Sequence, residues 1–237
     1  METAQYLDST YLKLPQQAGI SEEETLEKVL QLTDEAHENK IFAVMIRPEY
    51  VHQVKQYLNG KNSDVKVGTV IGFHEGTYST EEKEKEAQQA IADGADELDF
   101  VLNYEEFKKG NLELVENEVL TCTKICLDHG KTAKWIIETA ALCDEQIAEI
   151  TQKINDWVSS NFPGKEEMVF VKSSTGFFQT EDGKPNGATF EAIQIMLDHA
   201  GKLPVKAAGG VRTPDDAKRM IELGVKRIGT SSAVALL

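Results

Sequence analysis

Residues 168–176, MVFVKSSTG, indicate a strand that is buried on both faces and then turns at a glycine. A continuous apolar run such as VFV is typical of a strand in a parallel sheet that helices cover on both sides. Lys172 stands at the end of this run, where burial of an ammonium group is costly. The stretch therefore predicts either a chemical role for Lys172 or a side chain that extends to solvent.

Short β-branched runs alternate with segments of helical periodicity along the rest of the chain. Ser21 with Glu24, and Ser79 with Glu82, form capping-box patterns at the starts of two intervening helices, and Thr213 caps a third. Eight units of strand and helix favour an α/β fold of the TIM (β/α)8 barrel type over an open, doubly wound sheet. The expected strands are 5–10, 42–46, 66–73, 97–103, 133–139, 168–174, 204–209 and 227–231.

The composition limits the number of domains and the kinds of partner. A chain of 237 residues that is 41 % hydrophobic suits one domain, which we expect to span 1–237. A formal net charge of −15 repels polyanions, so nucleic acid and anionic membrane surfaces are not expected partners. The N-terminal residues do not resemble a signal peptide, and no apolar run approaches the ~18 residues that cross a bilayer. We expect a soluble, cytoplasmic protein.

The cysteines and histidines do not have the spacing of metal ligands. Cys122, Cys126 and Cys143 form no C-x-x-C pair, so we expect reduced thiols and no metal site. Cys122 and Cys126 lie four residues apart and are expected to pack on one helix face. The acid-rich runs 22–24 and 81–86 are expected to be solvated helix faces.

Four charged residues on the expected strands are candidates for catalysis. A lysine in an apolar barrel loses hydration, and a second ammonium group nearby lowers its pKa further. The resulting amine can form a Schiff base with an aldehyde or ketone. Asp99 would need a cationic partner, and it serves either in a structural ion pair or in proton transfer. The four candidates are Asp99, Lys134, Lys172 and Lys206.

The turns after the last three strands predict an anion site. Barrels often bind phosphate at these loops, because glycine lets backbone N–H groups approach the phosphate oxygens. Arg212 either attracts the anion or pairs with a neighbouring acid. Glu138 has the same strand parity as Lys134 and is an additional candidate for the site. The turns are STG at 174–176, AAGGVRT at 207–213 and GTSS at 229–232.

These motifs together resemble the deoxyribose-phosphate aldolase family of class I aldolases, which have a TIM barrel. The resemblance extends over almost the whole chain and rests on YLDSTYL, TVIGF, GADELDFVLN, KWIIET, VKSSTGF, VKAAGGVRT and RIGTSS, in that order. It implies reversible cleavage of 2-deoxy-D-ribose 5-phosphate to acetaldehyde and D-glyceraldehyde 3-phosphate without a metal or organic cofactor.

The resemblance also implies a role for each candidate. Lys172 would form the imine and Lys206 would tune its amine, while Asp99 would join proton transfer beside Lys134. A homodimer is a further possibility. Phosphate contacts would fall on Gly176, Gly209, Gly210, Gly229, Ser231 and Ser232.

Three departures from the family pattern stand out, and one nearby residue is unassigned. The loop at 73–76 reads FHEG where many relatives have FP followed by HG, so it is expected to have a different shape. Met45 replaces a cysteine, so we expect resistance to electrophiles that attack a thiolate there. Arg47 has no assigned role, and the chain lacks the tyrosine-ended tail that some relatives carry.

Two other kinds of function stay open on the sequence alone. One is another Schiff-base barrel, such as a transaldolase or an aldolase for longer sugar phosphates. The other is a barrel that binds a sugar phosphate without turnover, as a sensor or scaffold.

Overall fold

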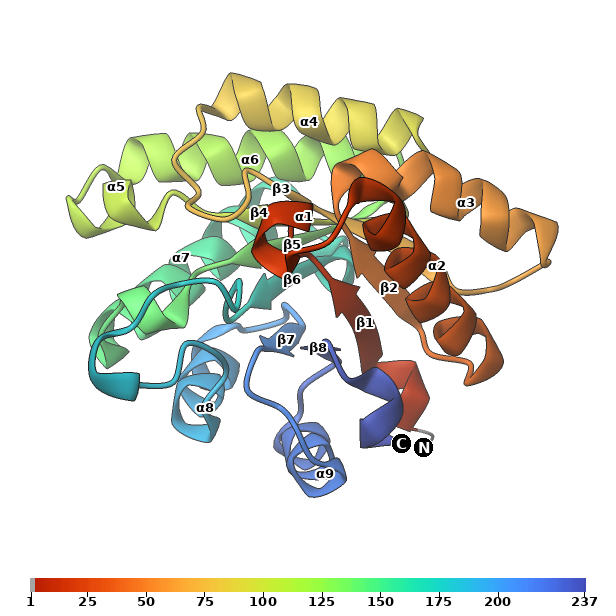
Figure 1. Cartoon of the computed structure of the whole chain (residues 1–237). Helices are drawn as coiled ribbons and strands as arrows, with labels where there is room; N and C mark the ends of the chain where they lie inside the picture. The colour runs from red at the N-terminus through yellow and green to blue at the C-terminus, as the bar shows by residue number, and fades with distance from the viewer. Residues whose placement is uncertain (1–2) are drawn as a thin grey trace.

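Eight parallel strands close into a barrel in the computed structural model, which describes residues 3–237 (Figure 1). Each strand pairs with the next, and β8 pairs with β1. The closed sheet confirms the TIM barrel and rules out the open sheet. Met1 and Glu2, the first residues of the expected domain 1–237, lie outside the described residues. The strands are β1 (Leu7–Tyr11), β2 (Ala43–Ile46), β3 (Lys66–Ile71), β4 (Glu97–Val101), β5 (Thr132–Ile136), β6 (Val169–Lys172), β7 (Val205–Ala208) and β8 (Arg227–Thr230).

The helices surround the strands, and the C-terminal segment returns beside β1 (Figure 1). Ser21 and Glu24 exchange side-chain and backbone hydrogen bonds at the start of α2, and Ser79 and Glu82 do so at the start of α4, as the capping boxes predict. None of these helices is long and apolar enough to span a membrane, within residues 3–237. The helices are α1 (Pro15–Ala18), α2 (Glu22–Glu38), α3 (Val51–Gly60), α4 (Thr80–Ala92), α5 (Tyr104–Lys108), α6 (Leu112–Asp128), α7 (Asp144–Asn161), α8 (Phe190–His199) and α9 (Pro214–Leu223).

Several strands end earlier than the sequence predicts. β3 ends at Ile71 rather than 73, β4 at Val101 rather than 103, β5 at Ile136 rather than 139, and β6 at Lys172 rather than 174. Beyond β6, the hydroxyl of Ser173 accepts from the N–H of Ala208 at 3.0 Å and donates to its carbonyl at 3.2 Å. Because this side chain takes backbone groups that a longer ladder would use, the chain turns away at the mouth of the barrel.

Lys83 contradicts the prediction that residues 81–86 form a solvated helix face. Glu81 and Glu82 are exposed, but Lys83 is fully buried where α4 packs on α6. Its ammonium group donates to the carbonyls of Gly76 and Val101, at 2.8 and 2.7 Å, and to the carboxylate of Glu118. Lys83 therefore joins the loop after β3 to the end of β4.

Replacing Lys83 by methionine should lower the free energy of unfolding by about 3–5 kcal/mol, because it leaves Glu118 buried without a cation. Urea unfolding measures this change. Lys83→Met/Glu118→Leu, which removes both charges, should regain part of the loss. The control is Lys85→Met on the exposed face of α4. A Lys83 variant as stable as this control would contradict the ion pair.

Candidate active site

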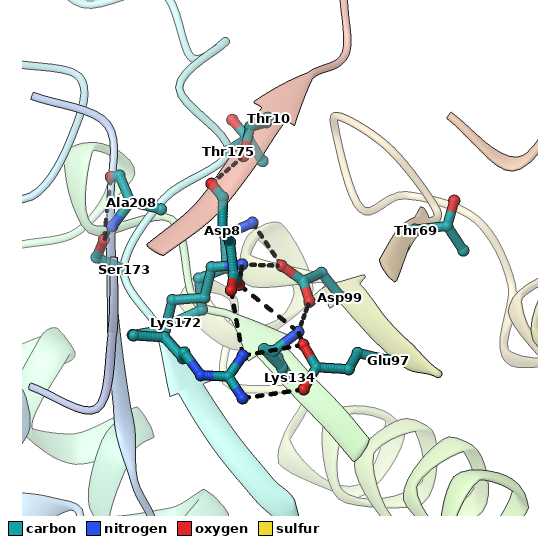
Figure 2. A network of polar contacts seen from close by, with 12 residues as sticks. Asp8, Thr10, Thr69, Glu97, Asp99, Lys134, Lys172, Ser173, Thr175 and Ala208 are labelled. Atoms are coloured by element: carbon teal, nitrogen blue, oxygen red, sulfur yellow. Dashed lines mark hydrogen bonds and ion pairs between the residues drawn. The ribbon is translucent and has the colours of Figure 1, made fainter. Parts of the chain in front are cut away.

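Seven charged side chains lie inside the barrel, and we call them the barrel network. The register pairs Asp99 with Lys134 and Lys172 with Lys206, so side chains of each pair leave neighbouring strands on the same face. Figure 2 shows the carboxyl groups of the network turned toward the basic groups. The members, all buried, are Asp8, Glu97, Asp99, Lys134, Lys172, Lys206 and Arg227.

Asp99 is the centre of the network and contacts all three lysines. Its Oδ1 lies 2.8 Å from Nζ of Lys134. Its Oδ2 accepts from both Lys172, at 2.8 Å, and Lys206, at 2.9 Å. The two ammonium groups on Oδ2 therefore cannot lie farther apart than the sum of those distances. The structure thus brings together the four residues that the sequence singled out as catalytic candidates.

Three further charged residues, which the sequence analysis did not select, complete the network. Asp8 lies 2.5 Å from Nζ of Lys206, and Glu97 lies 2.7 Å from Nζ of Lys134. Arg227 bridges the two carboxylates, at 3.1 Å from Asp8 and 3.2 Å from Glu97. Glu97 stands two residues before Asp99, so strand parity could have indicated its direction.

Burial and neighbouring charges act differently on Lys172 and on Lys134. Burial and the neighbouring charge of Lys206 lower the pKa of Lys172 to about 8, although Asp99 opposes this. Burial also opposes ionisation of Asp99, yet the lysines hold its pKa well below its usual range. Lys134 behaves in the opposite way, because Asp99 and Glu97 outweigh burial and raise its pKa. Four basic groups face three carboxylates, so the loss of one proton from Lys172 leaves a neutral set.

A cavity of about 730 Å³ opens above the network and reaches Lys172. Lys134, Lys206 and Asp99 are fully buried and do not line it. Gly209 and Gly210, with φ of 77° and 82°, adopt a backbone conformation that favours glycine. All six predicted phosphate contacts line this cavity, namely Gly176, Gly209, Gly210, Gly229, Ser231 and Ser232.

Gly229 differs from the other five because it is buried. A Cβ added there would lie 3.1 Å from Cε of Lys206 and 3.3 Å from Cβ of Ala208. Glycine at position 229 therefore makes room for Lys206, and its phosphate contact stays a prediction. Arg212 and Lys13 also line the cavity, and Arg212 makes no ion pair with an acid among the described residues.

The loop of residues 178–187 closes one side of the cavity and is fixed at its C-terminal end. A Cβ added to Gly187 would come 2.5 Å from the carbonyl carbon of Gly209, so the two backbones are in close contact. Asn186 donates to the carbonyls of Gly176 and Phe178, at 3.3 Å each. Gln179 and Asn186 line the cavity.

Aromatic side chains occupy the altered loop at 73–76. Phe73 packs edge-on against Phe177, with ring centroids 5.1 Å apart, and His74 stacks on Phe177 at 5.5 Å. Arg47, which had no predicted role, donates from Nε to the carbonyl of Leu12 at 2.9 Å and lies over the Phe73 ring. These contacts join the loops after β1, β2, β3 and β6 at the mouth of the barrel.

The remaining sequence predictions concern sulfur-containing residues and metals. Met45 is buried beside Gly68. A Cβ added at Gly68 would come 2.2 Å from the sulfur of Met45. Cys122 and Cys126 are buried free thiols, and burial raises the pKa of Cys126 to about 12, as expected for packing residues. In residues 3–237, no group of three or more His, Cys, Asp or Glu side chains is arranged to hold a metal ion.

Glu138 is buried beside the loop that follows Lys172. Its φ of 56° is left-handed, which costs a non-glycine residue about 1–3 kcal/mol. Oε2 accepts from both the backbone N–H and the hydroxyl of Thr175, and burial raises the pKa of Glu138 to about 7. Strand parity does not place Glu138, because β5 ends at Ile136, and its role in the site stays a prediction.

Comparison with known proteins agrees with this geometry. A model of DeoC/LacD family aldolases matches residues 3–237. Proteins named deoxyribose-phosphate aldolase from Thermococcus kodakarensis and Caldicellulosiruptor saccharolyticus are 40 % and 39 % identical, covering 100 % of this chain and 96 % and 97 % of the relative. The deoxyribose phosphate aldolase structure from Aeropyrum pernix is 28 % identical, with a TM-score of 0.79 over 99 % of this chain and 88 % of that one. The chain belongs to the DeoC/LacD aldolase family.

Replacing Lys206 by leucine should raise the pKa of Lys172 above about 8, because a like charge is removed and Asp99 is left to pair more fully with Lys172. The measurement is the pH dependence of Lys172 modification by a small aldehyde with borohydride, followed by peptide mass spectrometry. Lys202→Leu is the control, because this lysine is exposed. An unshifted midpoint in the Lys206 variant would contradict the coupling.

Proposed function

We propose that this family member reversibly cleaves 2-deoxy-D-ribose 5-phosphate to acetaldehyde and D-glyceraldehyde 3-phosphate, with Lys172 forming the Schiff base. The observation that carries the proposal is a buried lysine of lowered pKa at a cavity whose rim is built from glycine and serine loops. The two relatives of about 40 % identity are named for this activity, and they match this chain over 100 % of its length.

Lys172 is the nucleophile in the proposed mechanism. With a pKa of about 8, about one in ten of its amines is neutral at pH 7, roughly 300-fold more than for a lysine of ordinary pKa. The neutral Nζ attacks the C1 aldehyde of the open-chain sugar, and loss of water gives an iminium. The C3 hydroxyl then loses its proton and the C2–C3 bond breaks, releasing D-glyceraldehyde 3-phosphate. The bonding electrons move to C2 and form an enamine.

Protonation at C2 and hydrolysis of the iminium then release acetaldehyde and restore the amine. Asp99 and Lys206 are the proposed proton carriers, because Asp99 accepts hydrogen bonds from both Lys172 and Lys206. Lys134 has a raised pKa and stays protonated, so its proposed role is to hold Asp99 in place. The proposed role of Asp8 is likewise to hold Lys206 in place.

The phosphate is proposed to bind at the rim formed by Gly176, Gly209, Gly210, Ser231 and Ser232, with Lys172 at the reacting end. The cavity of about 730 Å³ suits a small sugar phosphate. Arg212 and Lys13 add positive charge at this rim, which offsets the formal charge of −15 on the whole chain. A homodimer in the cytoplasm stays a prediction; the Aeropyrum pernix relative is described as tetrameric.

Borohydride trapping with acetaldehyde tests the Schiff base. We expect reductive labelling of Lys172, located by peptide mass spectrometry, and its loss in Lys172→Arg. Turnover of 2-deoxy-D-ribose 5-phosphate is expected to disappear in the same variant. Protein that binds the sugar phosphate but is neither labelled nor active would instead support a sensor or scaffold. Labelling with turnover only of longer sugar phosphates would support a different Schiff-base aldolase.

Introducing a carboxylate at the rim tests the phosphate site. Ser232→Asp should raise KM for 2-deoxy-D-ribose 5-phosphate by about tenfold or more, because the two negative charges repel. Acetaldehyde carries no phosphate, so its trapping on Lys172 should change less than about twofold. Ser160→Asp, at an exposed position on α7, is the control. Equal losses in both reactions would move the phosphate site elsewhere.

A further inference from the structure

Glu138 is the exception among the buried carboxylates. Asp8, Glu97, Asp99, Glu118 and Glu166 each have a cation within 4.0 Å. Glu138, with 1 % of its surface exposed, has no such partner among the described residues, and its Oε1 accepts no hydrogen bond from them. Burial of a carboxylate without a cation is costly, so a structural ion pair does not explain this residue.

The backbone at Glu138 adds a second cost. A glutamate with φ of 56° and ψ of 69° occupies a conformation that glycine and asparagine adopt more easily. The flanking residues hold it there, because Ile137 N–H donates to the carbonyl of Lys172 at 3.0 Å and Thr139 N–H to that of Ser173 at 2.9 Å. The chain therefore follows β6 on both sides of Glu138, which places Glu138 beside Thr175.

The contacts of Glu138 lead into the substrate cavity through Thr175. Oε2 accepts from the backbone N–H and the hydroxyl of Thr175, and that hydroxyl in turn accepts from the N–H of Phe177 at 3.0 Å. Thr175, Gly176 and Phe177 all line the cavity. One carboxylate oxygen thus fixes Thr175, which lies between Lys172 and Gly176 of the proposed phosphate rim, and the Thr175 hydroxyl in turn holds Phe177.

We propose that Glu138 is a positioning residue that acts through Thr175 to hold the loop of residues 173–177 in its substrate-binding shape. The identity of the bound substrate rests on the proposed function, whereas the contact between Glu138 and Thr175 is independent of it. In its ionised form, above its raised pKa of about 7, Glu138 is a stronger acceptor than an amide, so it holds the loop more firmly than a neutral residue of the same size. The strain at residue 138 is retained because asparagine or glycine would not reach Thr175 in the same way.

The first test separates positioning from folding. Glu138→Asn suits the left-handed backbone and should unfold at the same temperature as the unchanged protein or higher, while kcat/KM for 2-deoxy-D-ribose 5-phosphate falls by about tenfold or more, mainly through KM. Glu138→Gln should fold and lose a similar amount, because an amide accepts more weakly. Glu166→Gln, a buried glutamate before β6, should keep kcat/KM. Unchanged kcat/KM in both Glu138 variants would overturn the proposal.

The second test asks whether Glu138 acts through Thr175. Thr175→Val keeps the shape and removes the hydroxyl, and Thr175→Ser keeps the hydroxyl. We expect Thr175→Ser to retain KM, and Glu138→Gln to cost less than about twofold more in the Thr175→Val background. Full multiplication of the two losses would overturn the coupling, as would equal activity of Thr175→Val and the unchanged protein.

The third measurement distinguishes failure of this inference from failure of the proposed function. Borohydride trapping of acetaldehyde on Lys172 should persist in Glu138→Gln, because the amine and its network are untouched. Loss of trapping in the unchanged protein would refute the aldolase mechanism. Persistent trapping with unaltered KM in the Glu138 variants would refute only the positioning role.

Discussion

The sharing of one carboxylate, that of Asp99, among three ammonium groups is the interaction on which the rest of the site depends. Without it, Lys134, Lys172 and Lys206 would stand close together in a dry interior with two carboxylates deeper in the barrel. Buried charges are tolerated only when they are paired and hydrogen-bonded. Asp99 makes the cluster possible and at the same time limits how far the pKa of Lys172 can fall.

The barrel divides structure and chemistry between its two surfaces. The outer face of the strands carries apolar side chains, such as Trp135 of β5, which stacks on Phe100 of β4 with ring centroids 4.9 Å apart. The inner face carries the charges, and the loops at the carboxyl ends carry the cavity. Successive side chains of a strand point to opposite faces of the sheet. Asp99 of β4 therefore points into the barrel, whereas Trp135 of the neighbouring strand β5 points out toward the helices.

The sequence was sufficient for the fold and for the central part of the site. Alternation of strands and capped helices indicates the barrel, and lysines inside apolar strands indicate reactive amines because burial must be explained. Asp8, Glu97 and Arg227 were missed because they stand near the beginnings of strands, where a charged residue is usually solvated. The sequence does not distinguish Lys83 from its neighbours, because residues 81–86 of helix α4 are all charged and its partner Glu118 is 35 residues away. The left-handed backbone at Glu138 has no local signal, since neighbouring hydrogen bonds to β6 impose it.

The close contact of Gly187 with Gly209 separates two regions of the cavity wall that differ in tolerance to change. Residues 186–188 are locked, because Asn186 bonds to Gly176 and Phe178, and Ala188 N–H donates to the carbonyls of Ala208 and Gly209. The hydrogen bond from Asn186 to the carbonyl of Phe178 already joins the two ends of the segment 179–185. Extra residues in this segment therefore cost little closure entropy. This short segment is where new side chains could be grafted to admit bulkier aldehydes, leaving the anion rim and the lysines undisturbed.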